Sequence, residues 1–181
     1  MTETSGGCVY DGTALEGAEI NLDEGQILLK GPMLFGGYRL DPALTEESLA
    51  GGWFRTADFG KFDQSGRLQV LGRVDEMIIT GGEKVSPAQV EAILEQHPSI
   101  KKAAVTGLPS KAWGQEVAAA IVPTNPSENV SLAEIRAFVA ERASKAMAPK
   151  QLIQVPKLPK TQNGKIKRSA LRSLFDPSET E

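Results

Sequence analysis

The chain has 181 residues, of which 40% are apolar and 24% are charged, and its formal net charge is −3 at pH 7. This composition is typical of a soluble globule with one ordinary or two small domains, and the acidic balance argues against a nucleic-acid or anionic-membrane surface. One cysteine, Cys8, and one histidine, His97, exclude an internal disulfide and a zinc cluster. No apolar run reaches the roughly 18 residues of a membrane span, and we expect a cytoplasmic protein.

The first 70 or so residues are predicted to be mostly β structure with many turns. The first 25 residues show no clear hydrophobic period, which indicates loop and turn. Residues 26–30 predict a short strand, and residues 45–49 a helical turn capped by Thr45. Residues 63–66 (DQSG) lie between apolar stretches, which predicts a hairpin with its glycine in the left-handed conformation.

From about residue 75 onward the pattern changes to alternating strands and helices. Ser86 and Ser131 each begin a helix with a capping-box pattern, and His97 is interpreted as a solvated residue at the end of the first helix. Strands are expected over 77–80, 103–108, 117–122 and 152–155, and a short last helix over 169–175. The continuous apolar run 117–122 indicates burial on both faces of the sheet. The order predicts an α+β domain that follows the end of a β-rich subdomain, with a boundary close to Asp75.

Four segments stand out for their chemistry. They are Thr2-Glu3-Thr4, the stretch 52–58 (GWFRTAD), the stretch 72–91 with its Gly81-Gly82 pair, and the stretch 159–166 (PKTQNGKI). Each alone has an ordinary explanation, as a chain end, core packing, a tight turn or a solvated loop. In this order and at this spacing, the four together resemble the late motifs of the adenylate-forming superfamily. That family contains acyl-CoA synthetases, luciferases and the adenylation domains of peptide synthetases.

The resemblance implies a fold and a domain organisation. Residues 1–74 would be the end of a large N-terminal adenylation domain, part of a β-rich, distorted-barrel subdomain, and 75–176 a small mobile α+β domain, with 177–181 as a tail. The chain would begin inside the family's Tyr-Gly-x-Thr-Glu loop, so that the phosphate-binding loop lies upstream. The missing N-terminal domain is therefore an expected partner, and the chain alone is expected to be inactive. A homo-oligomer stays open.

The resemblance also assigns residues that hold the nucleotide. Thr2 would contact a phosphate of ATP, and Glu3 would help to hold Mg²⁺, which prefers carboxylate and phosphate oxygens. Asp58 would accept hydrogen bonds from the ribose hydroxyls, because a carboxylate offers two acceptor oxygens to a vicinal diol. Arg73 would reach the nucleotide with its planar guanidinium.

Further residues are implied for a two-step reaction of a carboxylic acid with ATP and then coenzyme A, all three of them substrates. Asp75 would be the hinge between the domains. Gly81 and Gly82 would line the channel for the pantetheine arm of coenzyme A. Lys165 would be the catalytic lysine, whose ammonium bridges the carboxylate and the α-phosphate during adenylation.

The sequence departs from the family pattern in places and leaves alternatives open. Ala57 stands where the family usually has glycine, and Ile79 where many members have lysine. Residues 2–12 and 78–85 are similar to one subfamily of acid–CoA ligases in particular. An adenylation domain that loads a carrier protein is one alternative, although no carrier domain follows residue 181 of this sequence. A non-enzymatic docking module is another, although such a module has no need of the Lys165 loop.

Overall fold

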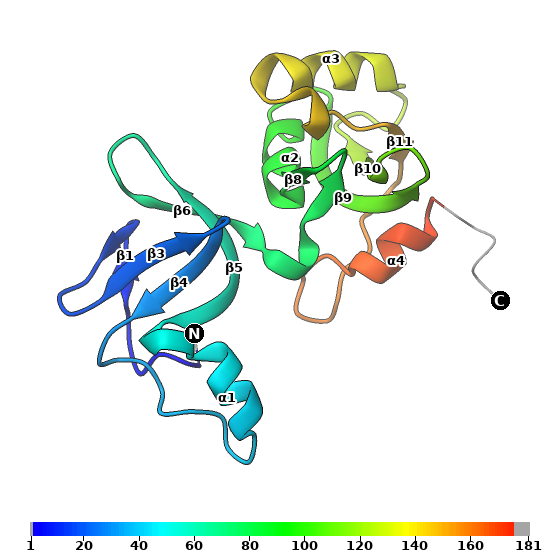
Figure 1. The fold of residues 1–181 in the computed structure, drawn as a ribbon. Helices are drawn as coiled ribbons and strands as arrows, with labels where there is room; N and C mark the ends of the chain where they lie inside the picture. The colour runs from blue at the N-terminus through cyan, green and yellow to red at the C-terminus, as the bar shows by residue number, and fades with distance from the viewer. Residues whose placement is uncertain (1, 176–181) are drawn as a thin grey trace. The chain divides into compact units, whose positions relative to one another are not determined.

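The computed structural model describes residues 2–175, and the chain divides into two compact units, Met1–Asp75 and Glu76–Glu181. Figure 1 shows the helices and strands of both units. Among the described residues, no helix is long and apolar enough to cross a membrane.

The first unit is built on an antiparallel sheet of four strands in the order β3-β4-β5-β6. The strands are β3 (Glu19–Asp23), β4 (Gln26–Lys30), β5 (Phe54–Phe62) and β6 (Leu68–Arg73), and a separate small hairpin pairs β1 (Val9–Tyr10) with β2 (Thr13–Ala14). β3 and β6 are the two edges of this sheet, so the part of the β-rich subdomain that the structure describes is an open sheet without barrel closure.

Local sequence rules predict most of this sheet, but not its first strands. The predicted strand at 26–30 is confirmed as β4, and Ile27 and Leu29 form the core with Leu68. The expected loop over the first 25 residues is wrong, because it contains β1, β2 and β3. In β3, Ile20 and Leu22 alternate with exposed residues and pack on that core.

The turns and the helix of the first unit are held by polar groups. The predicted hairpin is confirmed: the amide of Gly66, with φ 76°, donates to the carbonyl of Asp63 at 3.0 Å. Helix α1 (Pro42–Ser48) begins earlier than predicted, and its cap is Asp41, whose Oδ1 accepts from the Leu44 amide at 2.9 Å. Thr45 lies inside this helix, where its hydroxyl donates to the Asp41 carbonyl. The Asp-Pro pair supplies both a side-chain acceptor and a suitable first helical residue. Two short 3₁₀ turns, η1 (Ala50–Gly52) and η2 (Val74–Glu76), flank the last two strands.

The second unit is organised around strand β10 (Gly114–Pro123). β10 pairs antiparallel with β9 (Ile100–Ser110) along one edge, and on its other edge it pairs parallel with β11 (Gln151–Gln154). One residue pair, Gly114 with Thr80, joins β10 to β7 (Ile78–Thr80), which forms a hairpin with β8 (Glu83–Val85).

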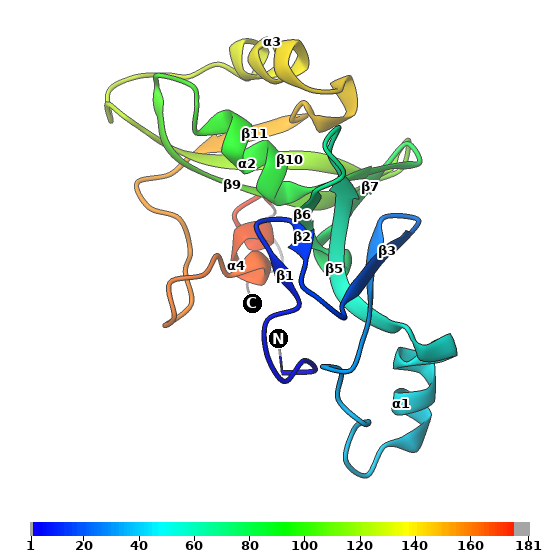
Figure 2. The ribbon, with the colours of Figure 1, turned by 90° about the vertical axis from the view of Figure 1, so that its left-hand side faces the viewer.

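Helices cover both faces of this sheet, as Figure 2 shows for α3 and α4. The helices are α2 (Pro87–Leu94), α3 (Leu132–Arg142) and α4 (Arg168–Ser173), with a 3₁₀ turn η3 (Lys145–Met147) after α3. Val117, Ala119 and Ile121 of β10 pack in the core under α2 and α3, while Ala120 packs on the other face with Leu171 of α4. The predicted burial of this strand on both faces is therefore confirmed.

The two predicted helix caps are confirmed, but the interpretation of His97 is wrong. The hydroxyls of Ser86 and Ser131 each accept from the amide three residues later, at 3.2 Å. His97 is only 6% exposed, and its ring lies edge-on to Phe138 with 4.7 Å between the centroids. Its Nε2 lies 3.3 Å from a carboxylate oxygen of Glu134. The side chain is thus covered by α3 instead of being solvated.

Candidate functional site

The two residues expected to hold the nucleoside lie on neighbouring strands. Asp58 of β5 and Arg73 of β6 are directly opposite each other in the antiparallel register. Asp58 is half-buried, and its amide donates to the Thr56 hydroxyl at 3.1 Å. Arg73 is exposed, and its Nε donates to Asp75 Oδ1 at 3.1 Å. The structure thus brings an acceptor suited to hydroxyls and a donor suited to phosphate side by side where β6 ends.

Thr2 and Glu3 lie on a separate segment that is fixed along residues 33–35. The carbonyl of Glu3 accepts from the Phe35 amide at 2.9 Å, and the Ser5 amide donates to the Met33 carbonyl at 2.9 Å. Thr2 is exposed and Glu3 is half-buried. Over residues 2–175, no three His, Cys, Asp or Glu side chains gather in a group that could hold a metal ion.

Gly81 and Gly82 form the turn between β7 and β8, and both have the left-handed backbone that favours glycine, with φ 58° and 84°. The Gly81 amide donates to the carbonyl of Trp113 at 3.0 Å. Trp113 is 50% exposed, and the Nζ of Lys150 lies 3.9 Å from the centroid of its ring. Sequence reasoning missed Trp113 as a neighbour of the glycines. The sequence itself shows only an aromatic residue before Gly114, between two predicted strands.

Lys165 lies in a small hairpin formed by residues 160–166. Lys160 bridges to Ile166, and the Thr161 amide donates to the Lys165 carbonyl at 2.8 Å. Gly164, with φ 79°, closes the turn through a hydrogen bond from its amide to the Thr161 carbonyl. The Lys165 side chain is exposed. The backbone of the hairpin is therefore ordered by hydrogen bonds while the lysine side chain stays accessible.

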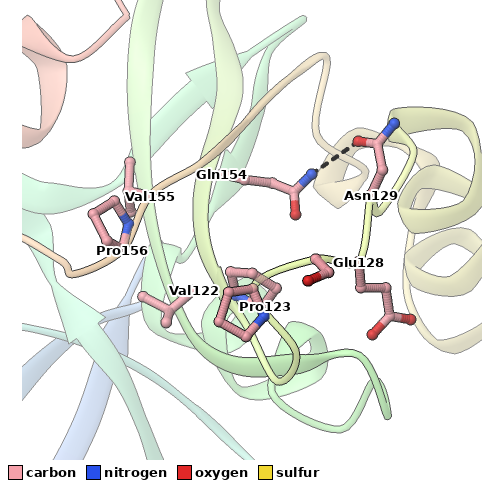
Figure 3. A pocket seen from close by; sticks show the side chains of 9 residues that line it. Val122, Pro123, Glu128, Asn129, Gln154, Val155 and Pro156 are labelled. Atoms are coloured by element: carbon pink, nitrogen blue, oxygen red, sulfur yellow. Dashed lines mark hydrogen bonds between the residues drawn. The ribbon is translucent and has the colours of Figure 1, made fainter.

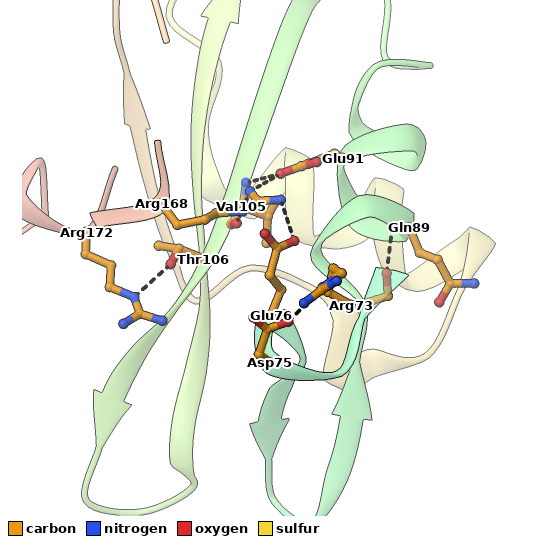
Figure 4. A network of polar contacts seen from close by, with 10 residues as sticks. Arg73, Asp75, Glu76, Gln89, Glu91, Val105, Thr106, Arg168 and Arg172 are labelled. Atoms are coloured by element: carbon orange, nitrogen blue, oxygen red, sulfur yellow. Dashed lines mark hydrogen bonds and ion pairs between the residues drawn. The ribbon is translucent and has the colours of Figure 1, made fainter. Parts of the chain in front are cut away.

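Sequence reasoning also missed a network of polar contacts around Arg168, which follows soon after Lys165 in the chain (Figure 4). Arg168 Nη1 donates to Glu91 Oε1 at 2.5 Å and to the Val105 carbonyl at 2.8 Å. Its Nη2 lies 3.6 Å from Glu76 Oε2. The basic run after the Lys165 loop was visible in the sequence, but its acidic partners are distant along the chain.

Two hollows of the second unit contain none of the expected site residues. One, of about 500 Å³, lies where the parallel strands β10 and β11 end, between Val122, Pro156 and the loop with Glu128 and Asn129 (Figure 3). The other, of about 640 Å³, is bordered by Lys101, Lys102, Lys157 and Lys160. The first hollow contains no residue of the four motif segments, whereas the second touches the fourth segment through Pro159 and Lys160.

Residues 89–165, all in the second unit, match the family of AMP-binding enzyme C-terminal domains. A probable 2-succinylbenzoate–CoA ligase of Mycobacterium tuberculosis (strain ATCC 25618 / H37Rv) is 44% identical over 178 residues, which are 97% of this chain and 46% of the relative. A 2-succinylbenzoate–CoA ligase of Listeria monocytogenes serotype 4b is 40% identical, over 89% of this chain and 34% of the relative. The chain therefore spans less than half the length of these relatives.

Two solved structures are also similar to most of this chain. The o-succinylbenzoate CoA synthetase (MenE) of Bacillus subtilis, in complex with the acyl-adenylate intermediate OSB-AMP, is 31% identical with a TM-score of 0.76, over 94% of this chain and 36% of that one. The amide bond synthetase McbA of Marinactinospora thermotolerans is 31% identical with a TM-score of 0.78, over 91% and 35%. The resemblance to AMP-forming acyl-CoA synthetases is thus confirmed. The subfamily that residues 2–12 and 78–85 indicate, o-succinylbenzoate–CoA ligase, is also the one that these relatives are named for.

Proposed function

We propose that this chain forms the C-terminal part of an ATP-dependent acid–CoA ligase that acts on o-succinylbenzoate in menaquinone biosynthesis. The observation that carries this proposal is the 44% identity to the probable 2-succinylbenzoate–CoA ligase of Mycobacterium tuberculosis over 97% of the chain. The exposed Lys165 and the Gly81-Gly82 turn support it, because one compact unit then offers a cation for one step and a turn without Cβ atoms for the next.

In the first step, a carboxylate oxygen of the acid bonds to the α-phosphorus of ATP, and pyrophosphate leaves. Both reactants are anions, so the step needs a positive charge where they meet. The ammonium of Lys165 is suited to this role, because a charge placed in advance stabilises the transition state without reorganisation. Asp58 would hold the ribose hydroxyls, and Arg73 and Thr2 would bind phosphate oxygens.

Magnesium enters this proposal only together with ATP. Mg²⁺ is commonly held by one or two carboxylates plus substrate phosphates, and it keeps several waters. The half-buried Glu3 supplies one such carboxylate, and the described residues offer no cluster that would hold the ion alone. Bound there, the ion would neutralise phosphate charge. Glu3 would orient the phosphates through it.

In the second step, the thiol of coenzyme A attacks the acyl carbonyl, the thioester forms, and AMP leaves. The Gly81-Gly82 turn would line the thin pantetheine arm, because the absence of Cβ atoms lets the ligand approach the backbone. The change between steps would occur at Asp75, which ends the first unit. A rotation there would remove Lys165 from the reacting atoms and bring in the glycine turn.

The test uses this chain together with the N-terminal portion of the Mycobacterium relative that the alignment leaves uncovered. After co-elution shows that the two parts assemble, acid-dependent ATP–pyrophosphate exchange and thioester formation are measured with o-succinylbenzoate. The proposal expects both activities. If exchange occurs but product forms only with a carrier protein or an amine as the acceptor, that acceptor replaces coenzyme A in the proposal. An assembled complex without exchange would favour a non-enzymatic docking module.

A further inference from the structure

We propose that Arg168 is a positioning residue for Lys165. Its side chain fixes the base of the lysine hairpin, residues 160–166, to the edge of the sheet. The consequence for catalysis rests on the function proposed above. The structural link between Arg168 and the hairpin can be tested without it.

The guanidinium of Arg168 is shared among three acceptors. It donates from Nη1 to the Glu91 carboxylate and to the Val105 carbonyl, at 2.5 and 2.8 Å, while Nη2 faces Glu76 at 3.6 Å (Figure 4). The side chains of Arg168 and Glu91 are only 22% and 18% exposed. Charged hydrogen bonds of this geometry are short and directional, and removing one partner leaves the other charge half-buried without its counter-ion.

The side chains of Arg168 and Glu91 bind the edge of β9 that faces away from β10. One edge of β9 pairs with β10, and at Val105 the other edge is occupied by side chains. The Val105 amide donates to Glu91 at 2.8 Å while its carbonyl accepts from Arg168, and the Ala103 amide donates to Glu95 at 3.3 Å. Side chains that satisfy backbone groups at an open edge protect it from other strands. Arg168 is therefore anchored to backbone as well as to a carboxylate.

The anchor is close to the catalytic hairpin along the chain. The Lys167 amide donates to the Pro159 carbonyl at 3.0 Å, which closes the stem just outside the bridge between Lys160 and Ile166. Arg168 follows at once as the first residue of α4. Only two residues separate Lys165 from Arg168, so a fixed guanidinium restricts where the stem can place the lysine.

The rest of α4 strengthens this anchor. Leu171 is fully buried in the core on that face of the sheet, and Arg172 Nε donates to the Thr106 hydroxyl at 3.2 Å. A helix of six residues is too short to be stable alone, so these contacts and Arg168 hold it in place.

Glu76 gives the same guanidinium a contact next to the proposed hinge. It is the first residue of the second unit and follows Asp75 directly. Its side chain is 42% exposed, so this contact is weaker than the one with Glu91. The guanidinium of Arg168 therefore connects the base of the lysine hairpin to the segment next to the proposed hinge.

The first experiment measures amide hydrogen exchange in the 181-residue chain. In Arg168→Gln, the amides of Thr161, Gly164 and Lys167 should exchange roughly tenfold faster, because the hairpin opens more often. Arg168→Lys should lie between this variant and the parent, because lysine keeps the charge but loses the fork. The matched control is Arg142→Gln, which removes an exposed arginine on α3.

The amides of β10 report whether the second unit remains folded. Unchanged exchange of the three hairpin amides in a folded Arg168→Gln variant would overturn the inference. If that variant unfolds, Glu91→Gln provides the same comparison, because it keeps the side-chain shape and removes the charge. Glu91→Gln should then speed the same amides, and the inference falls if it does not.

The second experiment uses the assembled ligase. Arg168→Gln should lower acid-dependent ATP–pyrophosphate exchange while thioester formation from supplied acyl-adenylate changes little, since only the first step uses Lys165. A merely structural role would lower both equally, which would overturn the inference. If Lys165→Ala suppresses pyrophosphate exchange but Arg168→Gln does not, the proposed function stands and this inference fails. If Lys165→Ala has no effect, the proposed function fails, while hydrogen exchange still decides whether Arg168 fixes the hairpin.

Discussion

The ring of Trp113 lies so close to Gly81 that a Cβ atom on the glycine would come within 2.9 Å of ring atom Cε3. The backbone adds a second constraint, because the φ of Gly81 is 58° and its amide donates to the Trp113 carbonyl. Gly82 has a similar left-handed φ of 84°, but a Cβ there would meet nothing within 4 Å. The two glycines therefore separate the effect of backbone conformation from that of contact with the indole.

Gly81→Ala should destabilise the chain more than Gly82→Ala, by about 1–2 kcal/mol. Both variants bear the strain of a left-handed alanine, but only Gly81→Ala must displace the ring. Urea denaturation measures the difference, and tryptophan fluorescence in a Trp53→Phe background reports the movement of Trp113. Equal losses of stability with an unchanged emission spectrum would contradict the close contact.

Lys165→Ala should lower acid-dependent ATP–pyrophosphate exchange in the assembled ligase by about 10²- to 10³-fold, the usual effect of removing one group that stabilises transition-state charge. Thioester formation from supplied acyl-adenylate should change much less. The control is Lys157→Ala, which removes an exposed lysine outside the hairpin. Similar losses in both half-reactions would contradict the assigned role of Lys165.

Features set by neighbouring residues could be predicted from the sequence. The caps at Ser86 and Ser131 and the turn at Gly66 follow from local hydrogen bonding, and all three occur as expected. The burial of β10 on both faces follows from a run of apolar residues too continuous for a half-exposed strand.

The features that were missed depend on residues far apart in the chain. β3 is a strand of only five residues, and it is fixed by pairing with β4. His97 looked solvated because its cover, Phe138, belongs to a later helix. The contact between Arg168 and Glu91 joins residues 77 positions apart. Side-chain pairs of this kind have no local signal, so sequence patterns indicated the Lys165 loop but neither its hairpin pairing nor what holds it.

Asp75→Pro should affect the two half-reactions unequally, whereas Asp75→Ala should affect both only slightly. The ion pair of Asp75 with Arg73 is exposed, at 70% and 53%, so its loss should change the free energy of unfolding by about 1 kcal/mol or less. Proline instead fixes φ near −65° and restricts Val74 before it, which favours one arrangement of a hinge. Separate assays of adenylation and thioester formation give the ratio of the two rates. An unchanged ratio in Asp75→Pro would argue against a hinge at this residue.

Leu171→Ala should destabilise the second unit by about 2–5 kcal/mol, the range for removing a fully buried leucine. Leu171 is 0% exposed and packs with Ala104, Ala120 and Leu158, and the two alanine side chains are too short to fill the space it leaves. Leu174→Ala is the matched control, because this leucine ends the same helix but is 43% exposed, and it should change stability by less than about 1 kcal/mol. Urea denaturation followed by circular dichroism compares the two variants. Because α4 begins at Arg168, Leu171→Ala should also speed amide exchange in the lysine hairpin. A stable Leu171→Ala variant with normal exchange there would show that α4 does not hold the hairpin.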